Sequence, residues 1–147
     1  MTKQQIQKVK NALRKLTFSD PFRNAAKKRA YIAPGLHKCE NCGVLCYSGS
    51  SLRNLEQLSE QYGEICTVDK WIKGRIRYYG IELDHIEPVV EPINGFLDWN
   101  LFMERMFPEN SKSFQNLCVI CHNIKTKMEN EDRGRDNIDW DDFYSNL

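Results

Sequence analysis

The chain has 147 residues, of which 41% are hydrophobic and 28% are charged, and its formal net charge is +1. This length suits one domain with a modest core. No run approaches the roughly 20 apolar residues that cross a bilayer, and the polar start of the chain lacks the apolar region of a signal peptide. These features exclude a membrane-spanning protein, and we expect a cytoplasmic protein with no membrane partner.

The charged residues are unevenly distributed along the chain. Residues 1–38 contain ten Lys/Arg against Asp20 alone, whereas residues 129–147 contain seven acids against two arginines. A basic segment beside a neutral body favours nucleic-acid binding, because Lys/Arg contacts to phosphates release counterions. The alternative is a solvated helix face, which most charge runs form.

The pattern of apolar residues predicts both helices and strands, and therefore an α+β protein. Apolar residues recur at helical spacing from Ile6 to Leu16 and in four later segments. Residues 67–83 are instead rich in β-branched and aromatic residues, which favour strands. Predicted helices cover residues 3–17, 21–30, 51–62, 96–107 and 121–130, and residues 114–120 form a second short strand or a knuckle.

Two Cys-x-x-Cys pairs, separated by more than 70 residues, are the strongest chemical signal in the chain. Cytoplasmic cysteines stay reduced, so this spacing indicates metal binding rather than disulfides. Four thiolates satisfy tetrahedral zinc, which would clamp two distant segments together. Cys46 and Cys66 are unassigned: each reads as a small buried hydrophobe, although Cys46 could compete as a ligand. The predicted zinc ligands are Cys39, Cys42, Cys118 and Cys121.

A second metal site is predicted from Asp84, His85 and His122. Asp84 and His85 end a predicted strand just before Pro88, and His122 directly follows the second cysteine pair. Neighbours on a strand point to opposite faces, but a bend into a loop lets both serve one site. Carboxylate and imidazole ligands suit magnesium or manganese. Asp84 and His122 would hold the ion and leave His85 as a base, whereas His37 reads as an ordinary surface or core residue.

Three motifs in this order resemble the HNH endonuclease family in its four-cysteine form, including the small stand-alone HNH proteins of tailed phages. The resemblance implies a ββα-metal (His-Me finger) core, in which two strands and a helix surround the catalytic ion. The resemblance covers about residues 30–130. Together with the charge distribution it leads us to expect a basic helical arm over 1–38, a nuclease domain over 39–130 with insertions at 47–80 and 89–112, and an acidic tail over 131–147. The motifs are Cys39-x-x-Cys42, Leu83-Asp84-His85-Ile86-x-Pro88 and Leu117-Cys118-x-x-Cys121-His122-x-x-Lys125-Thr126.

The resemblance also implies roles for individual residues. His85 matches the general base, Asp84 and His122 match the ligands of the catalytic ion, and the four cysteines match the zinc ligands. The family usually places an asparagine nine residues before the final histidine, where it orients the base. Here that position is Ser113. Either Ser113 or Asn116 replaces the asparagine, or the imidazole is held less firmly and the enzyme is slower.

The function expected from this resemblance is metal-dependent hydrolysis of phosphodiester bonds in DNA, leaving 5′-phosphate and 3′-hydroxyl ends. Sequence preference would be loose, because backbone contacts position a protein without specifying bases. Lys27, Lys28 and Arg29 are candidate DNA contacts, and Lys125 is either a phosphate contact or a surface lysine. The enzyme would act in the host cytoplasm if a phage encodes it. Duplex DNA, branched DNA and RNA, nicking and double-strand cleavage, and the oligomeric state all stay open.

Two other functions compete with this one. The fold could serve as a zinc-stapled adaptor for nucleic acid or protein that has lost activity, which Ser113 favours and the intact Asp84, His85 and His122 set opposes. It could also be a purely structural zinc protein whose apolar insertion helix contacts a partner. The acidic tail could dock on a partner or fold back over the basic arm.

Overall fold

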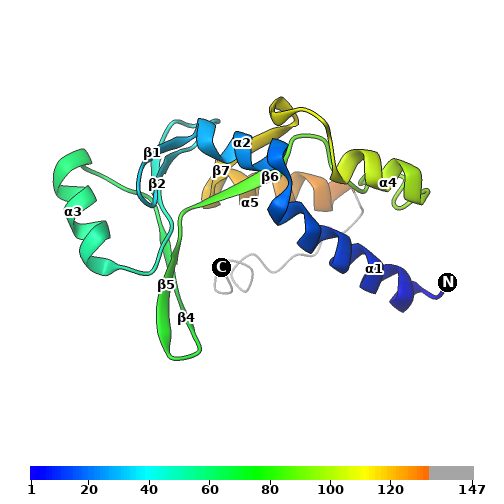
Figure 1. The fold of residues 1–147 in the computed structure, drawn as a ribbon, viewed down its shortest axis with the longest axis horizontal. Helices are drawn as coiled ribbons and strands as arrows, with labels where there is room; N and C mark the ends of the chain where they lie inside the picture. Colours follow the sequence, from blue (N-terminus) through cyan, green and yellow to red (C-terminus); the bar gives the residue numbers. More distant parts are fainter. Residues whose placement is uncertain (133–147) are drawn as a thin grey trace.

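The computed structural model describes residues 1–132. It has the mixed helix and strand content expected of an α+β protein (Figure 1). The predicted acidic tail, residues 131–147, lies outside the described residues except for its first two positions. Within the described part of the chain, no helix combines the length and apolarity needed to cross a bilayer.

Two helices open the chain and are capped by the residues that precede them. Thr2 caps α1 (Lys3–Leu16) with a reciprocal capping box, in which its hydroxyl oxygen accepts from the Gln5 backbone. A short 3-10 turn (Thr17–Ser19) leads to α2 (Pro21–Arg29), where the Asp20 carboxylate accepts from Phe22 N. The ends of both helices fall within one residue of the prediction. α1 buries none of its residues and extends away from the body (Figure 1).

A small three-stranded antiparallel sheet follows, which the sequence pattern did not predict. Its strands are β1 (Tyr31–Ala33), β2 (Leu36–Lys38) and β3 (Leu45–Tyr47), in the order β1-β2-β3. Each has three residues, too few to display an alternating pattern. The first cysteine pair lies in the loop between β2 and β3. Leu36 and Tyr47 of this sheet form one core cluster with Leu58 of α3 (Leu52–Tyr62) and with Tyr78.

The segment predicted to have strand character contains most of three separate strands. β4 (Val68–Ile72) and β5 (Arg75–Tyr79) form an antiparallel hairpin that projects from the body (Figure 1). β6 (Ile81–His85) follows after Gly80 alone and turns away to a different sheet.

β6 pairs antiparallel with β7 (Phe114–Cys118), from Ile81 opposite Cys118 to His85 opposite Phe114. The helix α5 (Val119–Asp132) follows β7 at once and packs on both strands. Two strands and a helix therefore carry the predicted site residues Asp84, His85, Asn116, His122 and Lys125, while Ser113 ends the 3-10 turn (Ser111–Ser113) just before β7.

The segment between β6 and β7 contains α4 (Trp99–Met106), shorter at both ends than the helix predicted over 96–107. Asp98 caps it by accepting from Leu101 N at 2.8 Å, so the helix cannot begin at Phe96. Phe96, Trp99 and Phe102 pack against one another, and Lys10 of α1 lies over the Phe96 ring. Much of the apolar surface of this insertion is therefore used within the molecule.

Candidate metal centre and the adjoining site

The four cysteines predicted to bind zinc lie together, although more than 70 residues separate the two pairs. Their sulfur atoms are all within 4.8 Å of one another. The Sγ atoms of Cys42 and Cys118 are 3.8 Å apart. A tetrahedron with Zn–S bonds of about 2.3 Å has S···S edges of about 3.8 Å. The prediction of a four-cysteine cluster that could hold zinc is confirmed.

Local backbone geometry shapes this cluster. Cys39 N donates to Val44 O at 2.9 Å and Gly43 N donates to Cys39 O at 3.0 Å, which closes a tight knuckle. Gly43 has φ of +79°, a left-handed conformation that glycine adopts without strain. Burial opposes ionisation of Cys39, but N–H groups of Cys42, Cys118 and Asn41 directed at its sulfur lower its pKa to about 6. The knuckle is thus prepared for the thiolate form that metals bind.

Cys46 and Cys66 lie outside the four-cysteine group. They face each other across an isolated bridge, and Cys46 is fully buried beside Cys39 and Cys118 in a second core cluster. Burial raises the pKa of Cys46 to about 12, which keeps it a neutral thiol. Both cysteines fit the role of small buried hydrophobes.

The predicted ligands of the catalytic ion, Asp84 and His122, come from facing elements, and each has a partner of its own. Asp84 Oδ2 accepts from Lys125 Nζ at 2.5 Å, and His122 Nδ1 is 3.4 Å from Glu82 Oε2. Lys125 Nζ also donates to His85 O at 2.7 Å and lies 3.0 Å from Glu129. Among residues 1–132, only the four cysteines form a group of three or more close ligand atoms. Asp84, His122 and Glu82 thus do not form such a group, and Asp84 is neutralised by Lys125 instead.

His85 occupies a half-buried position at the end of β6. Its ring packs on Phe114, with centroids 4.8 Å apart, and its Nε2 is 2.9 Å from Met106 O. A backbone carbonyl can only accept, so this bond requires a proton on Nε2 and leaves a lone pair on Nδ1 in the neutral ring. Burial lowers the pKa of His85, which favours this neutral form. The fold therefore supplies an oriented imidazole able to accept a proton.

Two cavities meet at His85. One, of about 490 Å³, is lined by His85 and Ser113 together with residues of α4. The other, of about 270 Å³, is lined by His85 and Asp84 together with Arg14 of α1 and Arg23 of α2. Arg23 Nη1 is buried and has no hydrogen-bond partner. Positive charge from the N-terminal helices thus faces Asp84 and His85.

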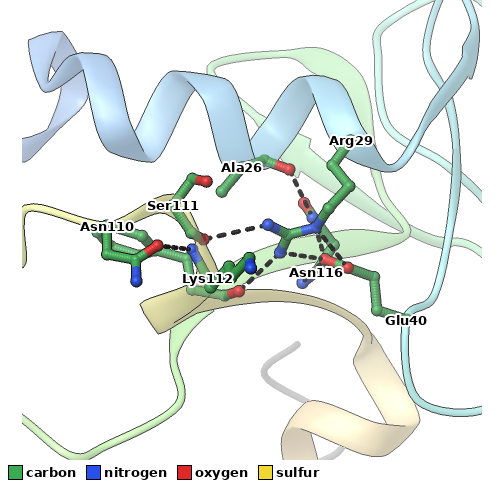
Figure 2. A network of polar contacts seen from close by, with 8 residues as sticks. Ala26, Arg29, Glu40, Asn110, Ser111, Lys112 and Asn116 are labelled. Carbon is green, nitrogen blue, oxygen red and sulfur yellow. Dashed lines mark hydrogen bonds and ion pairs between the residues drawn. The ribbon is translucent and has the colours of Figure 1, made fainter.

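A network of polar contacts ties α2 to β7 and to the cysteine knuckle (Figure 2). Arg29 binds both carboxylate oxygens of Glu40, at 2.7 and 3.0 Å, and donates to the carbonyl oxygens of Ser111 and Phe114. Asn116 is 2% exposed, and its amide donates to Ala26 O at 2.9 Å and to Glu40. We call Arg29, Glu40 and Asn116 the latch, because they join segments from three parts of the chain.

The other predicted site residues take varied positions. Asn116, a candidate for orienting His85, belongs to the latch, while His85 bonds to Met106 O. Ser113 shares a cavity with His85, and its carbonyl accepts from Ile86 N at 2.9 Å, which extends the β6–β7 pairing. Of the candidate DNA contacts, Lys27 and Lys28 are exposed on α2, whereas Arg29 and Lys125 are held by ion pairs.

Two residues near the site were missed by the sequence analysis. Glu82 faces His122, and strand alternation could have indicated it, because Glu82 and Asp84 share one face of β6. Arg23 enters the site from α2, which no local pattern near Asp84 could reveal.

No protein-family model, curated protein or solved structure matches this chain.

The latch leads to a prediction about stability. Asn116→Ala removes hydrogen bonds to a buried carbonyl and a carboxylate, so the free energy of unfolding should fall by about 2 kcal/mol. Urea unfolding followed by circular dichroism measures this loss. Asn100→Ala, on the exposed face of α4, is the matched control and should change stability by less than about 0.5 kcal/mol. Equal effects of the two substitutions would contradict a stabilising latch.

The stabilisation that the latch contributes should depend on pH. Burial opposes ionisation of Glu40, but hydrogen bonds from Arg29 and Asn116 hold its pKa below the ordinary value. Because the folded-state pKa is lowered, the stabilisation is complete above the unfolded-state value of about 4.3 and is lost as the pH falls through the folded-state value. The stability difference between wild type and Asn116→Ala should accordingly shrink in acid.

Proposed function

We propose that this protein is an HNH-type endonuclease that hydrolyses phosphodiester bonds in DNA, with β6, β7 and α5 as its ββα-metal core. One observation carries the proposal: a half-buried imidazole, held by Met106 O with its other nitrogen able to accept a proton, opens on the same cavity as Asp84 and two arginines. A general base, a carboxylate and fixed positive charge are the groups that phosphodiester hydrolysis requires.

In this proposal Asp84 and His122 hold a divalent ion, and Glu82 is close enough to His122 to add a carboxylate. This set of carboxylate and imidazole donors suits magnesium or manganese. When bound, the ion would stabilise the negative charge that develops on the phosphoryl group and on the departing 3′ oxygen. Lys125 must then share the Asp84 carboxylate with the ion or move away from it, since its ammonium group forms an ion pair with that carboxylate.

The remaining steps belong to side chains that are already in place. His85 accepts a proton from the attacking water at Nδ1, while its Nε2–H donates to Met106 O, which fixes the orientation of the ring. Arg23 and Arg14 line the same cavity, so they would place two positive charges beside a phosphate oxygen bound there. Lys27 and Lys28 are exposed for contacts to the DNA backbone, which would leave sequence preference loose. We place the protein in the cytoplasm, where its six free thiols would stay reduced.

A second candidate function is a zinc-stapled module that binds nucleic acid without cutting it. The ion pair between Lys125 and Asp84 favours it, because a lysine ammonium already neutralises the carboxylate proposed to bind the metal ion. Ser113, at the position of the family's usual asparagine, favours it as well.

Supercoiled plasmid distinguishes the two candidates. The endonuclease should convert it to the nicked or linear form with added magnesium or manganese and leave it intact without them. Arg23→Gln should need about tenfold more plasmid for half the maximal rate, because one charge-assisted phosphate contact is lost. Retarded but uncut plasmid with every metal tested would establish the binding module and reject the enzyme.

A further inference from the structure

The hairpin of β4 and β5, which we call the ribbon, is a projecting structure that the proposed chemistry does not use (Figure 1). Lys73 and Gly74 join its strands with φ of +51° and +75°, the left-handed pair typical of a tight two-residue hairpin turn. Trp71 near the tip is 73% exposed and Ile72 is 43% exposed. Tryptophan is enriched at binding interfaces, where its large ring packs against a partner.

The base of the ribbon is firmly attached. Tyr78 is 6% exposed, packs on Tyr47 and exchanges two backbone hydrogen bonds with Gly49, at 3.1 and 2.7 Å. Gly80, between β5 and β6, lies so close to the backbone of Tyr47 and Cys66 that any side chain there would collide with it. The ribbon is therefore held in a fixed direction relative to β6, which carries Asp84 and His85.

One face of the ribbon is basic. The pairing of Lys70 with Arg77 and of Ile72 with Arg75 places three cations on the same face, because alternate residues share a face. Lys73 adds a fourth at the tip. Asp69, the single acid between Val68 and Tyr79, belongs to the opposite face. Among the described residues, no acidic side chain pairs with Arg75, Arg77 or Lys73.

We propose that the ribbon is a second DNA-binding element that enters a groove of a duplex. Its basic face would contact the phosphate backbone on one side, and Trp71, which alternation places on the opposite face with Asp69, would pack against the nucleotides on the other. Five-residue strands extend about 17 Å, enough to reach the floor of a major groove about 8.5 Å deep, and the groove's width of about 12 Å admits a two-stranded ribbon. The choice of DNA rests on the proposed function. The ribbon would hold the duplex at a second point, away from the proposed cleavage site at Asp84 and His85 on β6.

The test measures the affinity of the full chain for a fluorescein-labelled 20-base-pair duplex by anisotropy, without added magnesium or manganese, at several salt concentrations. Arg75→Gln/Arg77→Gln should weaken binding and flatten the plot of log K against log salt by about 0.9 for each lost phosphate contact. The matched control compares two single substitutions, Arg75→Gln on the ribbon and Arg53→Gln on α3. Each removes one exposed positive charge, and only Arg75→Gln should weaken binding.

Trp71 provides an independent readout at the tip. In a Trp99→Phe/Trp140→Phe chain, where Trp71 is the remaining tryptophan, adding duplex should change the tryptophan emission, and the further substitution Trp71→Phe should abolish that signal. Circular dichroism and bound zinc establish that each variant is folded.

The possible results separate the ribbon from the nuclease. Weaker binding by the Arg75/Arg77 variant supports DNA binding by the ribbon, whether or not the wild type nicks plasmid. A wild type that never nicks plasmid would reject only the proposed nuclease activity. Unchanged affinity and salt dependence in that variant would overturn the ribbon while leaving the nuclease intact, and an acidic protein as its true partner would give this result. A wild-type chain that binds no duplex also overturns the ribbon.

Discussion

Under the proposed function, replacing His85 with alanine should reduce the nicking of supercoiled plasmid by at least 100-fold, while the chain stays folded and its metal content is unchanged. General-base catalysis contributes about 10²–10⁴-fold to rates, and His85 is the one imidazole that shares a cavity with Asp84 and Arg23 in the described structure. Agarose-gel assays of plasmid conversion over time, at equal protein concentration and with magnesium or manganese, measure the loss.

The loss of activity should reflect the chemical step and not unfolding, because the ring of His85 makes two main contacts in the described structure. Its removal gives up the packing on Phe114 and the hydrogen bond to Met106 O, whereas the His85 backbone still accepts from Lys125. His37→Ala is the matched control, because His37 is also half-buried and packs edge-on against an aromatic ring, that of Tyr31. Full activity of His85→Ala would assign the base elsewhere, and an equal loss in His37→Ala would indicate a general effect on the fold.

The parts of the structure that could be predicted are those whose signal is local or chemical. The cysteine cluster was predictable because thiolates at this spacing have few other uses in a reducing compartment. The end of α1 and the start of α2 were predictable because Ser19-Asp20-Pro21 stops the first helix and caps the second, with Pro21 at the first helical position. In each case the interaction that decides the structure lies within a few residues or depends on one residue type.

The parts that could not be predicted depend on partners far along the chain. Arg29 and Asn116 are ordinary polar residues in the sequence, and only the fold brings Asn116 to Ala26, 90 positions away. Lys125 was interpreted by default as a surface lysine, with a phosphate contact as the alternative, whereas the structure places its ammonium group between Asp84 and Glu129. Side chains with several donors or acceptors accept many partners, so tertiary packing selects among them.

The latch and the cysteine cluster together explain how the basic helices reach the candidate site. Glu40 directly follows Cys39, and its backbone N–H donates to Asn116 O at 2.8 Å. The cluster thus fixes Glu40, and Glu40 binds Arg29 at the end of α2. Arg23, two turns earlier on the same helix, is thereby held over Asp84 and His85. A metal in the cluster would act on the site through this chain of contacts, without touching it.

Removing the metal from the cysteine cluster should consequently have the largest effect on stability. Structural zinc contributes about 10–16 kcal/mol of apparent binding free energy in small zinc peptides, comparable to the whole stability of a typical domain. Cys121→Ser replaces one of the four sulfurs that lie within 4.8 Å of one another, and a strong chelator removes the ion altogether. Either change should lower the melting temperature by more than about 10 °C, since 1 kcal/mol corresponds to about 2–4 °C at this size.

Thermal unfolding by circular dichroism and zinc content per chain by atomic absorption measure these effects on the same samples. Cys66→Ser is the matched control: it also exchanges a thiol for a hydroxyl, but at a half-buried cysteine outside the four-cysteine group. It should keep one zinc ion per chain and unfold within a few degrees of the wild type. If Cys121→Ser keeps its zinc and its melting temperature, the four sulfurs are not a structural metal site, and the position of α2 over Asp84 must depend on the latch alone.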